Sequence, residues 1–239
     1  MGAGSFAVND WPRNPRDAIE LQKRLAKLVK IKPLAAPARI VAAIDLAHFG
    51  PARRPTHQAA GIIVYDMETK ETVERHWIIR PVTFPYIPGL LSFREAPAAI
   101  ELIEKVRTRV DVFLIDGQGL AHPRRFGIAC HIGVLINHPT IGCAKSRLIG
   151  EAKRDLPLKR GAYFELVHNG EVVGSLLRTR SNVKPVYVSV GHLITLDECR
   201  KIILELADRY RLPEPARLAH NYAQVSPVQA SDNDPPPPK

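Results

Sequence analysis

Residues 112–119 read VFLIDGQG, and this stretch limits the possible folds more than any other part of the chain. Four apolar residues lead into one carboxylate, Asp116, and a Gly-x-Gly turn follows. An apolar run of this length that ends at glycines predicts a strand buried in the middle of a sheet. Burying a carboxylate is costly unless a positive group meets it. Asp116 is therefore predicted to hold a charged ligand, with a metal ion as a good candidate, at the rim of the sheet.

The rest of the pattern predicts an α/β protein with a mixed central sheet flanked by helices. The element predictions, in order along the chain, are a helix at residues 14–30, strands at 39–45, 60–66 and 72–80, a helix at 92–109, the central strand at 112–116, a helix at 126–137, a strand at 139–143, short β segments over 161–190, and helices at 196–209 and 213–222.

Turn and cap chemistry adds detail to this outline. Residues 67–70 fit a hairpin turn, and residues 49–58, rich in proline and arginine, are expected to form an exposed loop. Pro85 and Pro88 exclude regular structure from residues 82–91. Ser92 is predicted to be the N-cap of the next helix, with Glu95 three residues later completing a capping box.

The 239 residues suit one large domain or one domain with a tail. We predict an extension at residues 1–13, a single catalytic domain at 14–222, and a disordered proline-rich tail at 223–239. Lysine and arginine number 34 against 24 acidic residues, which gives a formal net charge of +10. This excess favours nucleic acid or an anionic membrane surface as partner, although charge can also serve solubility alone.

Cysteine usage and hydropathy indicate the cellular setting. Cys130, Cys143 and Cys199 are scattered, odd in number and without CxxC spacing. We interpret them as reduced thiols of a cytoplasmic protein, and not as a disulfide framework or a zinc site. The N-terminus lacks the apolar core of a signal peptide, and no apolar run is long enough to cross a bilayer.

Three carboxylates are candidates for a metal site. Asp45 and Asp116 each end a predicted strand, and Glu95 lies in the first turn of a predicted helix. If the two strands are neighbours, both aspartates project from one rim, where Glu95 can face them. Such a set suits hard divalent cations such as Mg²⁺, and two ions roughly 3.5–4 Å apart would support phosphodiester cleavage. His220 is a candidate ligand or proton carrier.

Each of these residues also has an ordinary structural explanation. Asp45 alone is most simply a turn residue at a strand end, and Glu95 can be part of a cap without being a ligand. His220 alone is more often a hydrogen-bonded surface or core histidine. Lys145 is most simply a solvated charge, although a lysine after a buried strand can steady a phosphate.

Two loops extend the nucleic-acid hypothesis. The loop of Pro85, Tyr86, Ile87 and Pro88 is stiff, apolar and aromatic, and one use of such a loop is to wedge between bases. The alternative is a rigid connection whose tyrosine packs on the core. In residues 122–125, HPRR, the arginines either contact phosphates or form an exposed face.

Several long motifs, taken together, resemble the endonuclease V family. They are PYIPGLLSFRE, IDGQGLAHPRRFGIACHIGV, PTIGCAKSRL, KPVYVS with a following GH, and YRLPEPARLAH, and they occur in family order from residue 40 to residue 220. The resemblance implies a ribonuclease-H-like fold. It also implies a Mg²⁺-dependent endonuclease, with Mn²⁺ as a substitute, that acts on inosine in DNA. Such an enzyme cuts the second phosphodiester bond 3′ to the lesion and leaves 3′-hydroxyl and 5′-phosphate ends.

The resemblance also assigns roles by matching motif. Asp45, Glu95 and Asp116 are implied as metal ligands, while Lys145 and His220 join them as catalytic residues. Tyr86 occupies the wedge formed by residues 85–88. The implied lining of a pocket for the flipped base, and the histidine near it, are Gly89, Leu91, Gly127, Ile128, Ala144, Leu148 and His122. His131 also matches a family histidine and is given no role.

Hypoxanthine offers O6 as an acceptor and N1–H as a donor, so a fixed backbone N–H and C=O can read it. Two segments depart from the family pattern, at His48 and Phe49 and after Gly150. The second of these, in residues 151–166, is a candidate for a different nucleic-acid surface.

Three other functions compete with the repair endonuclease. The first is an endoribonuclease for inosine in RNA, which the 2′-hydroxyl beside the cut would distinguish. The second is a module that binds the lesion without cutting, but it would not need three carboxylates that repel phosphate. The third is another nuclease of the same fold, which should lack the wedge. The protein is expected to act as a monomer and without a membrane.

Overall fold

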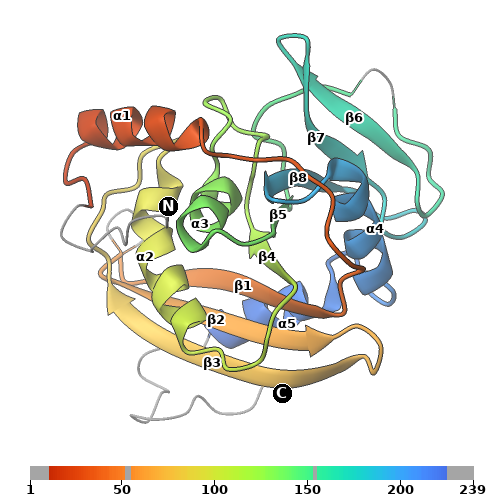
Figure 1. Cartoon of the computed structure of the whole chain (residues 1–239), viewed down its shortest axis with the longest axis horizontal. Coiled ribbons are helices and arrows are strands. Elements are labelled where there is room, and N and C mark those ends of the chain that lie inside the picture. Colours follow the sequence, from red (N-terminus) through yellow and green to blue (C-terminus); the bar gives the residue numbers. More distant parts are fainter. Residues whose placement is uncertain (1–10, 52–54, 153–154, 225–239) are drawn as a thin grey trace.

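The computed structural model describes residues 11–51, 55–152 and 155–224. One eight-stranded mixed sheet runs through it in the order β3-β2-β1-β4-β5-β8-β7-β6, which confirms the α/β prediction (Figure 1). The strands are β1 Ile40–Phe49, β2 His57–Asp66, β3 Glu71–Pro81, β4 Val112–Asp116, β5 Thr140–Ala144, β6 Tyr163–His168, β7 Glu171–Leu177 and β8 Val186–His192. The helices are α1 Pro15–Ala26, α2 Leu91–Glu104, α3 Ile128–Ile136, α4 Leu196–Leu206 and α5 Glu214–Ala223.

The predicted central strand is at the centre of the sheet. β4 pairs in parallel with β1 on one side and with β5 on the other, and it is buried up to Asp116. The Gly-x-Gly turn that follows is required by space. A Cβ on Gly119 would lie 2.0 Å from the carbonyl oxygen of Val190, and Gly117 has a φ of +146°. Only glycine fits both positions.

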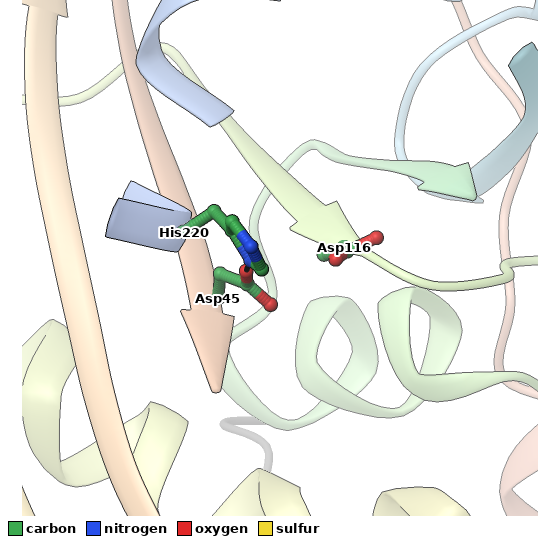
Figure 2. Close-up of side chains that lie close together, drawn as sticks. All are labelled: Asp45, Asp116 and His220. Atoms are coloured by element: carbon green, nitrogen blue, oxygen red, sulfur yellow. Dashed lines mark hydrogen bonds and ion pairs between the residues drawn. The ribbon is translucent and has the colours of Figure 1, made fainter. Parts of the chain in front are cut away.

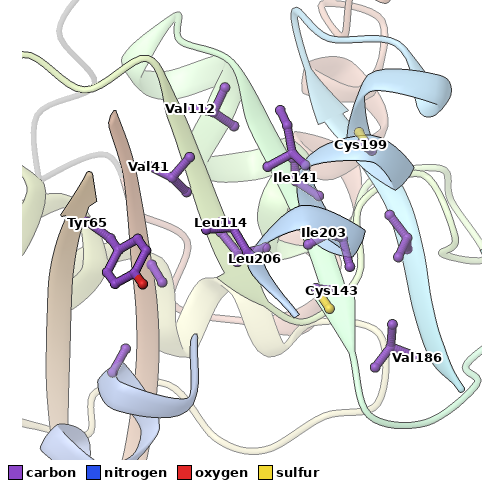
Figure 3. Packing of buried hydrophobic residues seen from close by; sticks show 14 of the residues in the cluster. Val41, Tyr65, Val112, Leu114, Ile141, Cys143, Val186, Cys199, Ile203 and Leu206 are labelled. Carbon is purple, nitrogen blue, oxygen red and sulfur yellow. The ribbon is translucent and has the colours of Figure 1, made fainter. Parts of the chain in front are cut away.

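Helices cover both faces of the sheet. One face packs against α4 and α5, with Val41, Ala43 and Leu114 among its residues (Figure 3). The other face packs against α2 and α3 through residues that include Ala42 and Phe113. Side chains of a strand alternate between faces, so successive residues along β1, and likewise along β4, belong to opposite cores.

Several predicted boundaries differ from the structure. β1 continues to Phe49 and β2 begins at His57, so these strands take residues 49, 57 and 58 of the loop expected at residues 49–58; residues 52–54 lie outside the described ranges. The first helix ends at Ala26 and the second at Glu104, short of the predicted residues 30 and 109.

The predicted capping box at Ser92 is wrong. α2 begins at Leu91 with Leu90 as its N-cap, and no side chain caps it. Ser92 lies within the first turn, where its Oγ is 3.0 Å from His131 Nδ1. A true capping box occurs instead at Thr195 and Glu198, at the start of α4. Glu95 is therefore free of the capping role that competed with its role as a ligand.

Trp11 anchors the beginning of the described chain to α2. Pro97 has no N–H, so the carbonyl of Phe93, four residues earlier, has no partner inside the helix. The indole Nε1 of Trp11 donates to that carbonyl at 2.7 Å. The tryptophan ring also stacks on His131, with ring centroids 5.2 Å apart. Trp11, in the predicted extension 1–13, is thus packed against the domain, and residues 1–10 are outside the described ranges. The tail predicted at 223–239 begins too early, because Ala223 is buried at the end of α5; residues 225–239 lie outside the described ranges.

All three cysteines are free and buried. Burial raises the pKa of the Cys143 thiol to about 12, and it raises the pKa of Cys130 and Cys199 as well. In the described ranges, none of the helices is both long and apolar enough to span a bilayer.

Candidate active site

Asp45 and Asp116 lie on neighbouring strands at one edge of the sheet. Ile44 and Ile115 are register partners in the parallel pair of β1 and β4, and each aspartate follows its isoleucine directly. By strand alternation both aspartates turn toward the face covered by α5. His220 reaches them from α5 (Figure 2). The prediction that the two aspartates lie side by side is confirmed, but Asp45 lies inside β1, which continues to Phe49, and only Asp116 ends its strand.

The contacts among these side chains are short. His220 Nδ1 lies 2.5 Å from Asp45 Oδ2, and Lys145 Nζ lies 2.6 Å from Asp116 Oδ2. The same lysine nitrogen is 4.0 Å from Asp45 Oδ2. One ligand atom each from Asp45, Asp116 and His220 fall within 4.8 Å of one another. The structure thus places four of the five predicted catalytic residues in direct contact.

Glu95 belongs to α2, which covers the face of the sheet opposite α5. Glu95 is 6% exposed and lines the same pocket as Asp45 and Asp116. It is not one of the three residues, Asp45, Asp116 and His220, whose ligand atoms lie within 4.8 Å of one another. Burial, followed by repulsion from Asp45 and Asp116, raises the pKa of Glu95 to about 8. Ionising Glu95 beside the two aspartates therefore costs free energy.

The charges of the cluster are unbalanced in the described structure. Burial and the charge of Asp116 raise the pKa of Asp45 to about 6, although Lys145 and His220 act against this shift. Burial lowers the pKa of Lys145, but the carboxylates of Asp116 and Asp45 outweigh it and raise that pKa above its usual value. One ammonium thus faces the two aspartates, and Glu95 adds a third carboxyl group to the same pocket.

A divalent cation fits this arrangement. Carboxylate oxygens are the ligands that hard cations prefer, and one imidazole nitrogen is compatible with Mg²⁺ or Mn²⁺. A cation would also remove the repulsion that raises the pKa of Asp45 and Glu95. Asp45, Asp116 and His220 thus fit a divalent metal ion both in the chemistry of their ligand atoms and in their spacing.

Asp45, Glu95 and Asp116, which we call the acidic cluster, open into a pocket of about 430 Å³. Most of the residues predicted to bind substrate line it, while Pro85 and Ile87 do not. The predicted residues in the lining are Tyr86, Pro88, Gly89, Leu91, His122, Gly127, Ile128, Ala144 and Leu148. Substrate and metal residues therefore share one continuous space.

The carbonyl oxygen of Gly89, at the pocket wall, accepts from three side chains. Arg124 Nη2 lies 2.7 Å from it, His122 Nε2 3.1 Å and Gln22 Nε2 3.2 Å. Gln22 also donates to the carbonyl of Phe126 at 2.7 Å. Burial, and then the charge of Arg124, lowers the pKa of His122 to about 4, so His122 is neutral at pH 7. The loop that carries Gly89 is thus held from α1 and from the segment after β4.

The two arginines of residues 122–125 are engaged within the protein. Arg124 faces inward to Gly89, and its Nε also bonds Gln22. Arg125 holds the β6–β7 hairpin, because its guanidinium contacts the carbonyl of His168 at 3.0 Å and Glu171 at 2.9 Å. The alternative that these arginines form an exposed face is therefore wrong, and a contact with phosphate stays a prediction.

Tyr86 projects from the wedge loop, with 63% of the residue exposed. The alternative that this tyrosine packs on the core is therefore wrong. Arg94 supports the loop from below: its Nε donates to the carbonyl of Phe84 at 2.9 Å, and its guanidinium lies 5.7 Å from the Tyr86 ring centroid.

Sequence reasoning missed Gln22 and His48. Gln22 is 1% exposed and occupies the buried face of α1 with Leu21 and Leu25; a polar residue inside an apolar helix stripe was the available signal. His48 Nε2 lies 3.7 Å from Glu95 Oε1, and burial together with Arg94 lowers its pKa. The sequence marked His48 only as a departure from the family pattern and gave it no role.

Comparisons with known proteins agree with these features. The family model for endonuclease V matches residues 23–221. Endonuclease V from Gloeobacter violaceus is 44% identical over 221 residues, which cover 92% of this chain and 89% of the relative. Endonuclease V from Nostoc is 44% identical over 219 residues, which cover 91% and 97%.

Solved structures give the same result for the fold. Endonuclease V from Streptomyces avermitilis superposes with a TM-score of 0.84 at 36% identity, covering 90% of this chain and 94% of that one. Endonuclease V from Ciona intestinalis, in complex with DNA containing an inosine followed by a ribo-adenosine, gives a TM-score of 0.75 at 23% identity, covering 87% and 95%; this second likeness concerns the fold alone. The chain belongs to the endonuclease V family of nucleases that act on DNA.

Proposed function

We propose that this chain recognises inosine in DNA and hydrolyses the second phosphodiester bond 3′ to it, as a metal-dependent step in the repair of deaminated DNA. The products would carry 3′-hydroxyl and 5′-phosphate ends. The observation that carries the proposal is the single pocket of about 430 Å³ that joins the predicted base site to Asp45, Glu95 and Asp116. A base held at one end of this pocket would bring its own strand to the carboxylates.

Asp45, Glu95 and Asp116, together with His220, would hold Mg²⁺, or Mn²⁺ in its place. When bound, the cation supplies an activated water and neutralises charge on the leaving oxygen. Asp45 orients the imidazole of His220 through the 2.5 Å contact. Lys145, held against Asp116, offers an ammonium to the phosphate that is to be cut.

Backbone groups would read the base. Leu91 and Ile128 are the first residues of α2 and α3, so their N–H groups have no acceptor within the helix. Both residues line the pocket, and such an N–H suits the O6 acceptor of hypoxanthine. The Gly89 carbonyl suits the N1–H donor, provided that one of its three present donors yields. Adenine offers the opposite pattern at these two atoms.

The wedge would open the stack. Tyr86 is exposed beside the pocket entrance on a loop stiffened by Pro85 and Pro88. An aromatic side chain that enters a base step offsets part of the cost of unstacking the flipped nucleotide.

We also propose a cytoplasmic monomer. The predicted catalytic residues and most of the predicted substrate residues already meet within one chain. The free, buried cysteines fit a reducing compartment.

The test is cleavage of end-labelled oligonucleotides, one DNA and one RNA, each with a single inosine, in Mg²⁺ and in EDTA. A Mg²⁺-dependent nick one nucleotide beyond inosine in DNA is the expected result. Faster cutting of the RNA would replace DNA by inosine-containing RNA as the main substrate. Binding without a nick in any divalent metal would overturn the proposed reaction.

A further inference from the structure

The edge of the sheet that carries the acidic cluster continues into a row of basic residues. β8 runs antiparallel to β5, β7 to β8, and β6 to β7. Lys145 directly follows the end of β5. Because of these pairings, the same edge also holds the start of β8, the end of β7 and the start of β6. The residues at these three positions include Lys184, Arg180, Arg160 and Lys159.

Hydrogen bonds tie this row to the active site and to the loop after α4. Arg211 Nη2 donates to the carbonyls of Lys145 at 2.7 Å and Pro185 at 2.8 Å, and its Nε donates to that of Lys184 at 2.9 Å. Arg180 Nη1 donates to the carbonyl of Arg209 at 2.6 Å. These bonds place the row beside Lys145 and not merely on the same edge.

We name the basic edge as the five exposed cations of this region: Lys159, Arg160, Arg180, Lys184 and Arg209. Within the described ranges, none of them forms an ion pair. Some arginines elsewhere on the surface do pair, for instance Arg125 with Glu171 and Arg217 with Glu214, so it is the combination of unpaired charge and position beside Lys145 that distinguishes the basic edge. The nearby Asp208 faces Lys70 at 3.6 Å, and Asp155 is exposed.

We propose that the basic edge binds the phosphates of the DNA arm that leaves the active site on this side. The inference rests on the proposed function, because it takes DNA as the substrate. Unpaired cations in a row beside a nuclease site match a strand of phosphates in charge, and phosphate contacts set register without reading sequence.

The reach of the surface can be bounded. From β4 to β6 the sheet order gives four strand spacings, which amount to about 19 Å at ~4.8 Å each. Duplex DNA advances ~3.4 Å per nucleotide of one strand, so the basic edge spans about five or six nucleotides. Part of the edge comes from the segment after Gly150 that departs from the family pattern.

The test compares two triple variants with the same loss of charge. Lys159→Gln/Lys184→Gln/Arg209→Gln removes exposed cations of the basic edge whose side chains make no hydrogen bond or ion pair in the described structure. The control, Lys105→Gln/Arg107→Gln/Arg109→Gln, removes three exposed cations just before β4, at the opposite edge of the sheet. Binding is measured in EDTA over a salt series, on one duplex with a single inosine and one without.

We expect the basic-edge variant to bind both duplexes more weakly and to lose about 0.9 from the slope of log K against log [salt] per phosphate contact, or about 2.7 in all. The control should keep the wild-type slope. An unchanged slope in the basic-edge variant, or an equal loss in the control, would overturn the proposal. If the wild type does not prefer the inosine duplex, the base-recognition proposal fails, while the slopes still decide on the basic edge.

A second measurement identifies the arm. Duplexes are trimmed to two nucleotides on one side of the inosine or on the other. Trimming the arm that lies on the basic edge should bring the wild-type slope down to that of the variant, and trimming the other arm should preserve the difference. If the difference survives both trims, the basic edge does not bind a flanking arm.

Discussion

Asp45 and Asp116 occupy equivalent positions on neighbouring parallel strands, each one residue beyond the register pair Ile44–Ile115. Because both strands cross the core in the same direction, their carboxylates emerge together at one edge. Lys145 lies 2.6 Å from Asp116 and 4.0 Å from Asp45. The spacing of the acidic cluster is thus a property of the sheet, and loop conformation has little part in it.

Asp116→Asn should abolish cleavage while DNA binding remains. The amide keeps the shape but not the charge that a metal ion requires, so we expect a loss of about a thousand-fold or more in cleavage rate. Asp197→Asn is the control, since that side chain is 85% exposed on α4. Single-turnover cleavage and EDTA binding on the same oligonucleotide measure both effects. Cutting at the wild-type rate would remove Asp116 from the metal site.

Tyr86→Ala should weaken binding to inosine in duplex DNA by about ten-fold or more, with a smaller effect on single strands. Opening a stacked step costs a few kcal/mol, and a single strand demands less of it. Val73→Ala, which shortens an exposed side chain on β3, at the other end of the sheet order from β6, serves as the comparison. Equal losses on the two substrates would rule out a wedge.

Glu95→Gln should stabilise the metal-free protein at pH 8. The pKa of Glu95 is raised from 4.5 to about 8 in the folded state, so folding is favoured below pH 4.5 and loses stability as the pH rises through 8. The glutamine removes that loss. We expect a melting temperature on the order of 5–10 °C above wild type at pH 8, and no such gain at pH 4.5.

Thermal melts in EDTA provide this measurement, and adding Mg²⁺ supplies the control. The ion should raise the melting temperature of the wild type more at pH 8 than at pH 5, because binding requires the ionised carboxylates. A variant with the wild-type melting curve at pH 8 would mean that Glu95 is not under electrostatic strain.

Arg124→Gln should raise the KM for inosine substrates by about five- to 150-fold, with a smaller change in kcat. The substitution removes one donor from the Gly89 carbonyl and loosens the pocket wall, and losing such a charged hydrogen bond costs about 1–3 kcal/mol. Arg125→Gln is matched in residue type and position but contacts the β6–β7 hairpin. Similar KM values for both variants would contradict a positioning role for Arg124.

The protein should lose stability in acid partly through His131. Burial lowers the pKa of this fully buried histidine to about 3, whereas the unfolded chain takes up the proton near pH 6.5. The contribution of neutral His131 to the free energy of unfolding is fully present above pH 6.5, and it falls toward pH 3 by about 1.4 kcal/mol per pH unit. Urea unfolding of His131→Gln should show a shallower decline, and His57→Gln, on an exposed residue, should follow the wild type.

Much of the fold was predictable because apolar periodicity is a local property. Val112–Asp116 was found from four residues and its flanking glycines, and the helix predicted to start at residue 14 begins at Pro15, with Asn14 as its N-cap. The cap of α2 was not predictable in the same way. Ser92 and Thr195 both begin an S/T-x-x-E pattern, but only Thr195 is a cap, because the hydroxyl of Ser92 is directed to His131 by tertiary packing.

The acidic cluster was predictable as residues but not as a geometry. Strand-end aspartates suggested one rim, yet the 2.5 Å contact of His220 with Asp45 joins residues 175 positions apart. The same holds for Gln22 and Gly89, whose contact depends on how α1 packs on the loop before α2. Long-range contacts of this kind leave no periodic trace in one sequence.

The burial of Cys130, Cys143 and Cys199 has a practical consequence for following the wedge in solution. Thiolates are the reactive form, and burial holds these three sulfurs as thiols away from solvent. A maleimide dye should therefore leave the native chain unlabelled. A single cysteine placed at position 86 would then take up one fluorophore on the wedge loop, and its emission would report base-pair opening without any prior removal of native cysteines.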